Sequence, residues 1–367
     1  MNFNKIMNFD NTIIYFFSGT GNSYRVAKWV EEKAEKTGSE CKLLFTRKVK
    51  KVNENNKWER KVIGIIFPTH GFTMPWELLK FVCRLPRSKK TDAFCIATRA
   101  SLKIGCVTIP GMSGNGTFVT ALILALKGYR VRGVMSVNMP SNWCLVHPIQ
   151  SIKRQKEILK RSNKKIDNFS SKIFAGKKVW FTLNNLYEIT DGILLSLISV
   201  GYMFIGRFFH AKLFLANSKC IACGICVNNC PFNAIKLRGK RSPKPFWTYR
   251  CESCMKCATL CPHYAIDLGQ SWGVILYFIA VLPVSIYLFT YLSHFSPGIA
   301  DLKGSWVGTL VDILFWYPAI FISYLIFHLL NRIPFINWIF THTTMTHIKS
   351  WGRYKELDTD LLTFDKE

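Results

Sequence analysis

The fold of the second half of the chain is set by a cysteine run, Cys220-Ile-Ala-Cys223-Gly-Ile-Cys226-Val-Asn-Asn-Cys230-Pro231. The run recurs thirty-one residues later as Cys251-Glu-Ser-Cys254-Met-Lys-Cys257-Ala-Thr-Leu-Cys261-Pro262. The likeness extends past the cysteines, where Pro-Phe-Asn-Ala-Ile-Lys-Leu (231–237) corresponds to Pro-His-Tyr-Ala-Ile-Asp-Leu (262–268). The chain therefore contains an internal duplication.

The spacing of these cysteines is typical of ligands to cubane iron–sulfur clusters. Three thiolates bind one [4Fe–4S] cluster, and the fourth, which precedes a proline, binds the other cluster. Zinc sites instead use two separated pairs of ligands, and disulfides need an oxidising compartment, which nothing in the sequence indicates. The predicted ligands are Cys220, Cys223, Cys226 and Cys261 for cluster 1, and Cys251, Cys254, Cys257 and Cys230 for cluster 2. The segment 216–270 thus resembles an α+β two-cluster ferredoxin of the bacterial type.

A second pattern lies near the N-terminus. Thr12–Phe17 reads as a buried strand, Ser18-Gly-Thr-Gly-Asn-Ser23 as a loop, and Tyr24–Thr37 as a helix. Backbone N–H groups of such a loop and of the helix that follows it point at an anion, and small hydroxyl residues add donors. The loop lacks the Gly-Lys-Ser/Thr ending of a Walker motif and the glycine spacing of a dinucleotide fingerprint. The pattern predicts a different kind of phosphate loop.

This loop resembles the FMN phosphate loop of flavodoxins, which matches here at Ser18, Thr20, Gly21, Asn22 and Ser23. Further strand-like and helix-like stretches alternate along residues 1–148, which predicts an α/β flavodoxin-like domain with a doubly wound parallel sheet. The expected strands are Cys41–Thr46, Lys61–Phe67, Ala93–Thr98 and Arg132–Asn138, and the expected helices lie near Trp76–Arg84 and Thr117–Lys127.

Ligands of such sheets bind at the carboxyl ends of the strands. The resemblance implies that flavin contacts come from two further loops, at Pro68, His70, Gly71, Phe72 and Trp76 and at Thr98 and Arg99. His70, Phe72 and Trp76 could flank the flavin ring, although a tryptophan that starts a helix can equally serve packing. The third loop, Thr98–Gly105, departs from the expected glycine-rich form, so the sequence leaves open whether FMN is bound.

Residues 12–268 resemble, in their order, a family in which a flavodoxin domain precedes a two-cluster ferredoxin. The two predicted domains are joined by residues 149–215, which combine a basic helix (Ile149–Phe174) with an apolar stretch, Gly192–Gly206. Fifteen residues are too few to cross a bilayer, so we expect this stretch to lie in the membrane interface.

Two longer apolar stretches, Trp272–Ser293 and Trp306–Leu330, follow the cysteine motifs. About twenty helical residues cross the hydrocarbon core of a bilayer, so residues 271–333 are predicted to form a transmembrane hairpin. Their link carries one lysine, Lys303, whereas the outer flanks are rich in Lys and Arg. The positive-inside rule then places both termini, both soluble domains and the tail 334–367 on the cytoplasmic side of the cell (inner) membrane.

The charge of the chain suggests which partners it meets. Lys and Arg number 49 against 22 Asp and Glu, a net charge of +27. Because no nucleic-acid recognition motif accompanies this charge, we expect no nucleic acid. Anionic membrane lipid and an acidic protein redox partner fit it better.

These patterns together predict a membrane-anchored electron-transfer protein that links FMN to two [4Fe–4S] clusters. Its partner would be a redox protein, a membrane complex or a quinone, and a flavin- and iron–sulfur-dependent oxidoreductase is one form it could take. An alternative is an accessory factor of a larger membrane redox complex, with an FMN-free flavodoxin-like docking module. A third is a structural protein whose clusters are not reversibly reduced.

Overall fold

The computed structural model describes residues 9–49, 60–89, 91–104, 107–144, 146–296, 298, 305–348 and 351–356. The start of the predicted first domain, the end of the predicted tail, and Lys303 in the predicted link lie outside them. The chain forms two compact units. Unit 1 comprises Met1–Trp143, His147–Met203 and Tyr354–Glu367, and unit 2 comprises Cys144–Val146 and Phe204–Arg353.

The centre of unit 1 is a sheet with five parallel strands in the order β2-β1-β3-β4-β6. Counted along the chain, with the short β5 left aside, this is the 2-1-3-4-5 order of flavodoxin-like doubly wound sheets. The strands are β1 (Asn11–Phe16), β2 (Glu40–Phe45), β3 (Lys61–Pro68), β4 (Asp92–Ile104) and β6 (Arg130–Pro140). The predicted fold class of this unit is confirmed by the strand order.

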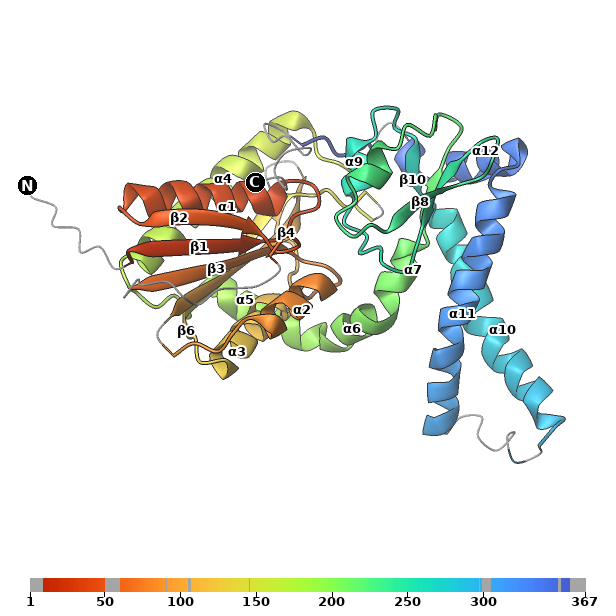
Figure 1. Ribbon diagram of the computed structural model, residues 1–367, viewed down its shortest axis with the longest axis horizontal. Coiled ribbons are helices and arrows are strands. Elements are labelled where there is room, and N and C mark those ends of the chain that lie inside the picture. The colour runs from red at the N-terminus through yellow and green to blue at the C-terminus, as the bar shows by residue number, and fades with distance from the viewer. Residues whose placement is uncertain are drawn as a thin grey trace, which may run out of the picture. The chain divides into compact units, whose positions relative to one another are not determined.

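Helices cover both faces of this sheet (Figure 1). One face carries α1 (Asn22–Lys36) and α4 (Ile152–Phe174); the other carries α2 (Trp76–Arg84), α3 (Gly116–Leu126) and α5 (Leu183–Leu194). The strands are buried on both sides, so they read as continuous apolar runs, as in β1 and β3. The sheet therefore supplies the core, and its loops are free to form a site.

The third predicted loop differs from expectation. We expected β4 to end at Thr98, but it continues to Ile104 and pairs antiparallel with β5 (Val107–Ile109). The continuation also pairs with β6 as far as Ser101. Residues 98–104 are thus strand rather than loop, because backbone donors and acceptors on both sides are satisfied by neighbouring strands.

Unit 2 begins with the end of the helical linker and contains two small antiparallel sheets, which surround the cysteine motifs. β7 (Phe214–Ala216) pairs with β10 (Ile266–Leu268), and β8 (Ile235–Arg238) pairs with β9 (Lys244–Trp247). Short helices α8 (Ile225–Asn228) and α9 (Lys256–Leu260) follow the second cysteine of each run. This duplicated layout matches the duplication in the sequence.

The longest helices of unit 2 are α10 (Gln270–Ser293) and α11 (Trp306–Leu330), which pack against each other. They are followed by α12 (Pro334–His342) and the short helix η3 (Met345–His347). Trp272 at the start of α10 stacks on Phe327 near the end of α11, with ring centroids 4.0 Å apart. Tyr324 of α11 is buried and donates to the carbonyl oxygen of Phe214 at 3.2 Å. These ends therefore belong to the protein core rather than to lipid.

Within the described residues, α11 is the one helix that is long and apolar enough to cross a membrane. Gln270–Ile279, the described first part of α10, is apolar and shorter than a membrane span. A second candidate arises only if α5 and the helical segment Ser196–Ala211, which meet at 67°, act as one broken span. Length and composition alone give weak support to a membrane span, and they leave the predicted hairpin a proposal.

Candidate cysteine centres and phosphate loop

The two cysteine motifs adopt the same backbone conformation. Each has a left-handed residue just before its second cysteine, another just after it, and a third beyond the fourth cysteine. Non-glycine residues rarely adopt positive φ. Because positive φ values recur at equivalent positions, the two loops follow the same backbone path. The pairs are Ala222 (57°) and Ser253 (50°), Gly224 (80°) and Met255 (63°), and Asn233 (49°) and Tyr264 (49°).

The eight thiols lie in two crossed sets, each with three cysteines from one run and one cysteine from the other. Burial, and to a smaller extent Cys220, Cys261 and Cys223, raise the pKa of Cys226 to about 12. Burial likewise raises the pKa of Cys257, with further increases from Cys251, Cys254 and Cys230. Thiols so crowded resist ionisation, whereas a coordinated metal deprotonates them outright. The donor sets therefore fit metal-bound thiolates.

A small cavity lies inside the first set. All four of its cysteines line the cavity, together with apolar side chains such as Ile221, Leu237 and Ile266. In the part of the chain that the structure describes, no three Cys, His, Asp or Glu side chains converge as ligands of a single metal ion. Sulfurs spread around a cavity suit a multi-iron cluster better than one ion.

Backbone amides point at the sulfurs. Ala234 N–H donates to Cys230 Sγ at 3.4 Å, and the equivalent Ala265 N–H donates to Cys261 Sγ at 3.3 Å. Ser253 N–H donates to Cys251 Sγ at 3.4 Å. Hydrogen bonds to cluster sulfurs stabilise negative charge and so tune the reduction potential.

Lysines lie near both cysteine sets, and one of them, the buried Lys256, is a neighbour of Cys254. Lys212 is fully buried; its Nζ donates to the Trp247 carbonyl oxygen and lies 4.6 Å from the Phe321 ring centroid. Burial lowers the pKa of Lys212 to about 7, while Cys251 opposes this shift. Lys244 Nζ donates to the carbonyl oxygen of Asn217 at 2.7 Å, and its pKa is lowered by burial and raised by Cys220. Lys212 and Lys244 are thus placed to offset the negative charge of different sets.

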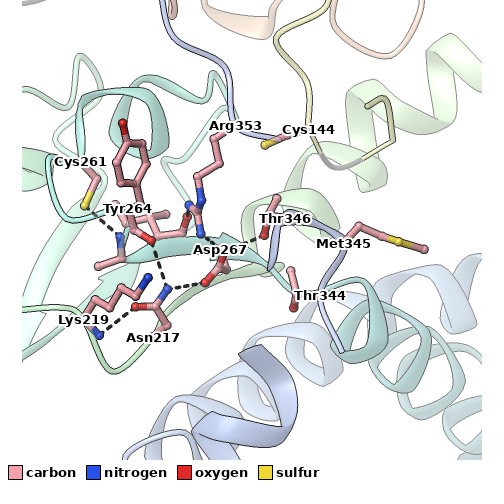
Figure 2. Close-up of polar contacts among 12 residues, drawn as sticks. Cys144, Asn217, Lys219, Cys261, Tyr264, Asp267, Thr344, Met345, Thr346 and Arg353 are labelled. Atoms are coloured by element: carbon pink, nitrogen blue, oxygen red, sulfur yellow. Dashed lines mark hydrogen bonds and ion pairs between the residues drawn. The ribbon is translucent and has the colours of Figure 1, made fainter. Parts of the chain in front are cut away.

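Asp267 ties the first set to the C-terminal part of unit 2 (Figure 2). Its buried carboxylate accepts from Asn217 Nδ2 at 2.6 Å and from Thr346 Oγ1 at 2.6 Å, and it pairs with Arg353. Asn217 Nδ2 also donates to the carbonyl oxygen of Tyr264, three residues after Cys261. This network fixes the backbone that carries Cys261.

In unit 1, the predicted phosphate loop lies between β1 and α1. Gly21 has φ 97°, which favours glycine, and its N–H donates to Ser18 Oγ at 3.1 Å. Ser23 Oγ is 2.8 Å from Thr98 Oγ1 on β4, and Asn22 Nδ2 donates to the Pro140 carbonyl oxygen at 2.9 Å. The sheet therefore brings the Ser18–Ser23 loop next to Thr98, which lies within β4.

Two residues far along the chain complete this loop. Asn142, just after β6, donates to Thr20 Oγ1. Glu356 pairs with Arg25 on α1, and its carboxylate accepts from the Tyr354 hydroxyl, which also lies 3.2 Å from Asn22 Oδ1. The Glu356 side chain is 2% exposed. A carboxylate of the same chain thus lies against Gly21 and pairs with Arg25 of α1, beside the loop at which the sequence predicts a phosphate.

The second predicted flavin loop forms a tight turn. His70 and Thr73 pair through their backbones, with Gly71 (φ 53°) and Phe72 (φ 62°) between them. The ring of Tyr202 lies against Gly71, and His70 contacts Phe17 edge-on at 6.3 Å between centroids. Pro68 pairs with Thr98 across the sheet, and Trp76 is half-buried at the start of α2.

Arg99 faces α5 rather than an open loop. It forms a buried ion pair with Glu188 and donates to Asn138 Oδ1 at 2.7 Å and Asn184 Oδ1 at 3.0 Å. Burial lowers its pKa to about 10. The structure therefore groups Thr98 with the phosphate loop and places the Arg99 guanidinium in a structural network.

The cysteine-rich segment matches a known protein family. Residues 219–265 match the 4Fe-4S dicluster domain family. No match was found among curated proteins. This segment of the chain is therefore an iron–sulfur domain of the dicluster class.

Among solved structures, the chain is similar to rubredoxin oxygen:oxidoreductase from Desulfovibrio gigas, at 12% identity over 46% of this chain and 36% of that one, with a TM-score of 0.30. It is also similar to an archaeal flavodoxin, at 18% identity over 44% of this chain and 98% of that one, with a TM-score of 0.27. It is also similar to flavodoxin from Megasphaera elsdenii, at 17% identity over 44% of this chain and 98% of that one, with a TM-score of 0.28. The strand order, rather than these overall likenesses, carries the flavodoxin-like assignment of unit 1.

Proposed function

We propose that the protein is a membrane-anchored electron carrier that links FMN, bound by unit 1, to two [4Fe–4S] clusters, bound by unit 2. The observation that carries this proposal is the pair of crossed cysteine sets in one chain with a flavodoxin-like unit. FMN exchanges one or two electrons and each cluster exchanges one, so the combination can split or assemble an electron pair.

The residues of the chain have distinct parts in this function. The eight cysteines hold the clusters, the amides of Ala234 and Ala265 donate to ligand sulfurs, and Lys212 and Lys244 offset their charge. In unit 1, the N–H groups at the start of α1 and Arg25 offer positive charge to the FMN phosphate. The second loop, with His70, Phe72 and Trp76, is proposed to border the flavin ring.

The membrane part of the proposal rests on α10 and α11. We infer that they form a transmembrane hairpin with both soluble units on the cytoplasmic side of the cell membrane, in keeping with the basic residues that flank it. Electrons would pass to or from a redox protein, a membrane complex or a quinone.

A second candidate function is favoured by Glu356. Because its carboxylate lies at the phosphate loop, unit 1 could act without FMN, as a docking module of an accessory factor for a membrane redox complex. The two functions differ in flavin content and share the clusters.

The test is anaerobic purification of the full chain in detergent, with iron, sulfide and extracted flavin counted on one sample. About eight iron and about one FMN per chain would support the electron carrier. About eight iron without FMN, even after incubation with FMN, would overturn the flavin part and leave the docking module.

A further inference from the structure

The helix α5 buries polar side chains and exposes apolar ones. Its polar residues Asn185, Glu188 and Asp191 are buried against the sheet. Asn185 Nδ2 donates to the carbonyl oxygens of Val134 at 3.1 Å and Trp180 at 2.8 Å, and Asp191 Oδ2 accepts from Gly114 N–H at 2.7 Å. An ordinary surface helix turns its apolar stripe toward the core. Here hydrogen bonds and the Arg99–Glu188 ion pair hold the helix to the sheet, and the apolar stripe faces away.

The outer surface of α5 and of the following α6 (Ser196–Gly201) is apolar. Leu186 is 62% exposed, Ile193 70% and Leu197 85%. From Phe181 to Val200 every exposed residue is uncharged. On the same side of the sheet (Figure 1), α3 exposes Leu122 and Leu126. So many exposed apolar side chains on one side of a unit mark a site that something covers.

The charges around this surface favour lipid over a protein partner. No Lys or Arg occurs between Lys178 and Arg207, whereas the rim of a protein–protein interface is polar. Exposed lysines Lys177 and Lys178 stand directly before the fully exposed Phe181, the arrangement of a segment that enters a membrane interface.

The helix α5 is too short to cross a membrane by itself. With twelve residues, α5 is about 18 Å long, shorter than the roughly 30 Å hydrocarbon core. Its polar face is also fixed to the sheet, so it cannot enter the bilayer without breaking the Arg99–Glu188 pair. We propose that unit 1 itself docks on the bilayer through the outer faces of α5, α6 and the end of α3. This docking goes beyond the proposed function, which places only the hairpin in the membrane.

The test uses the full chain reconstituted in phosphatidylcholine–phosphatidylglycerol vesicles, with the photoreactive residue benzoylphenylalanine in place of Leu186 or Leu197. Both positions should yield lipid adducts at least about tenfold above the same probe at Glu32, which is exposed on α1 on the opposite face of the sheet. A probe at Leu314 of α11 checks membrane anchoring separately.

Lipid adducts at Leu314 but not at Leu186 or Leu197 would overturn the docking surface and leave the anchor intact. No lipid adduct at any of the three would overturn both. The same probes irradiated in native membranes test the alternative, because an adduct with another protein at Leu186 and Leu197, without lipid, would show that a partner covers the surface and would also overturn the inference.

Discussion

The side chain of Glu356 lies directly on Gly21, so that a Cβ atom on Gly21 would stand 2.8 Å from Glu356 Cδ. Glu356 also pairs with Arg25, four residues further along at the start of α1. A carboxylate at a helix N-terminus is stabilised there as a phosphate would be. If the loop binds FMN as proposed, the phosphate and the Glu356 carboxylate would compete for the same place.

The first prediction concerns this competition. Glu356→Ala should strengthen FMN binding by roughly tenfold, about 1.4 kcal/mol, because it removes a charged competitor and frees Arg25. The affinity is measured by adding flavin-free full-length protein to FMN and recording the quenching of FMN fluorescence. Glu32→Ala removes the same charge from the exposed side of α1 and should leave affinity unchanged. Equal affinity in wild type and Glu356→Ala would show that the carboxylate does not exclude phosphate.

The second prediction separates crossed from uncrossed ligand sets. Cys261→Ala should give the same loss as Cys220→Ala, and Cys230→Ala the same loss as Cys251→Ala, with iron falling from about eight to about four per chain. Electron paramagnetic resonance of the reduced variants identifies which cluster survives. If Cys261→Ala instead removed the same cluster as Cys251→Ala, each motif would bind its own cluster and the crossed assignment would be wrong.

The sequence predicted those parts of the molecule that local spacing dictates. The cysteine sets followed from ligand spacing, because a cluster fixes which positions of a short loop can reach it. The loop Ser18–Ser23 followed from its place between a buried strand and a helix. The doubly wound parallel sheet of unit 1 followed from alternating strands and helices, which permit few topologies.

The remainder depends on contacts between distant residues. Arg25 and Glu356 are 331 positions apart, and an acidic residue near the end of a chain carries no signal of its partner. Arg99 was expected near a flavin, yet the structure buries it beneath α5, because Glu188 supplies a charge that no local pattern reveals. The apolar stretch Gly192–Gly206 can be recognised in the sequence. The side of α5 that carries the exposed leucines cannot, because the Arg99–Glu188 ion pair determines which side faces the sheet.

The third prediction uses the two lysines as matched probes. Lys212→Met should lower the potential of the cluster held by Cys251, because a buried cation favours the more negative, reduced state. The expected shift is on the order of 50 mV, about 1 kcal/mol for one electron. Lys244→Met should lower the potential of the other cluster by less, because Lys244 is only half-buried. Redox titration monitored by electron paramagnetic resonance resolves the two, and equal shifts of both clusters would contradict the assignment of one lysine to each.

The fourth prediction concerns the ion pair that holds α5 to the sheet. Arg99→Met leaves Glu188 buried without its counter-charge, which should cost about 3–5 kcal/mol, whereas replacing both residues by methionine should be nearly neutral. Hydrogen exchange on the full chain measures this locally, as faster exchange of the amides of α5 and of the β4 residues next to Arg99. Because Arg99 also donates to Asn138 and Asn184, the double variant should retain a small defect. If both variants were equally destabilised, these neutral hydrogen bonds, rather than the charge pair, would hold the helix with its polar face inward.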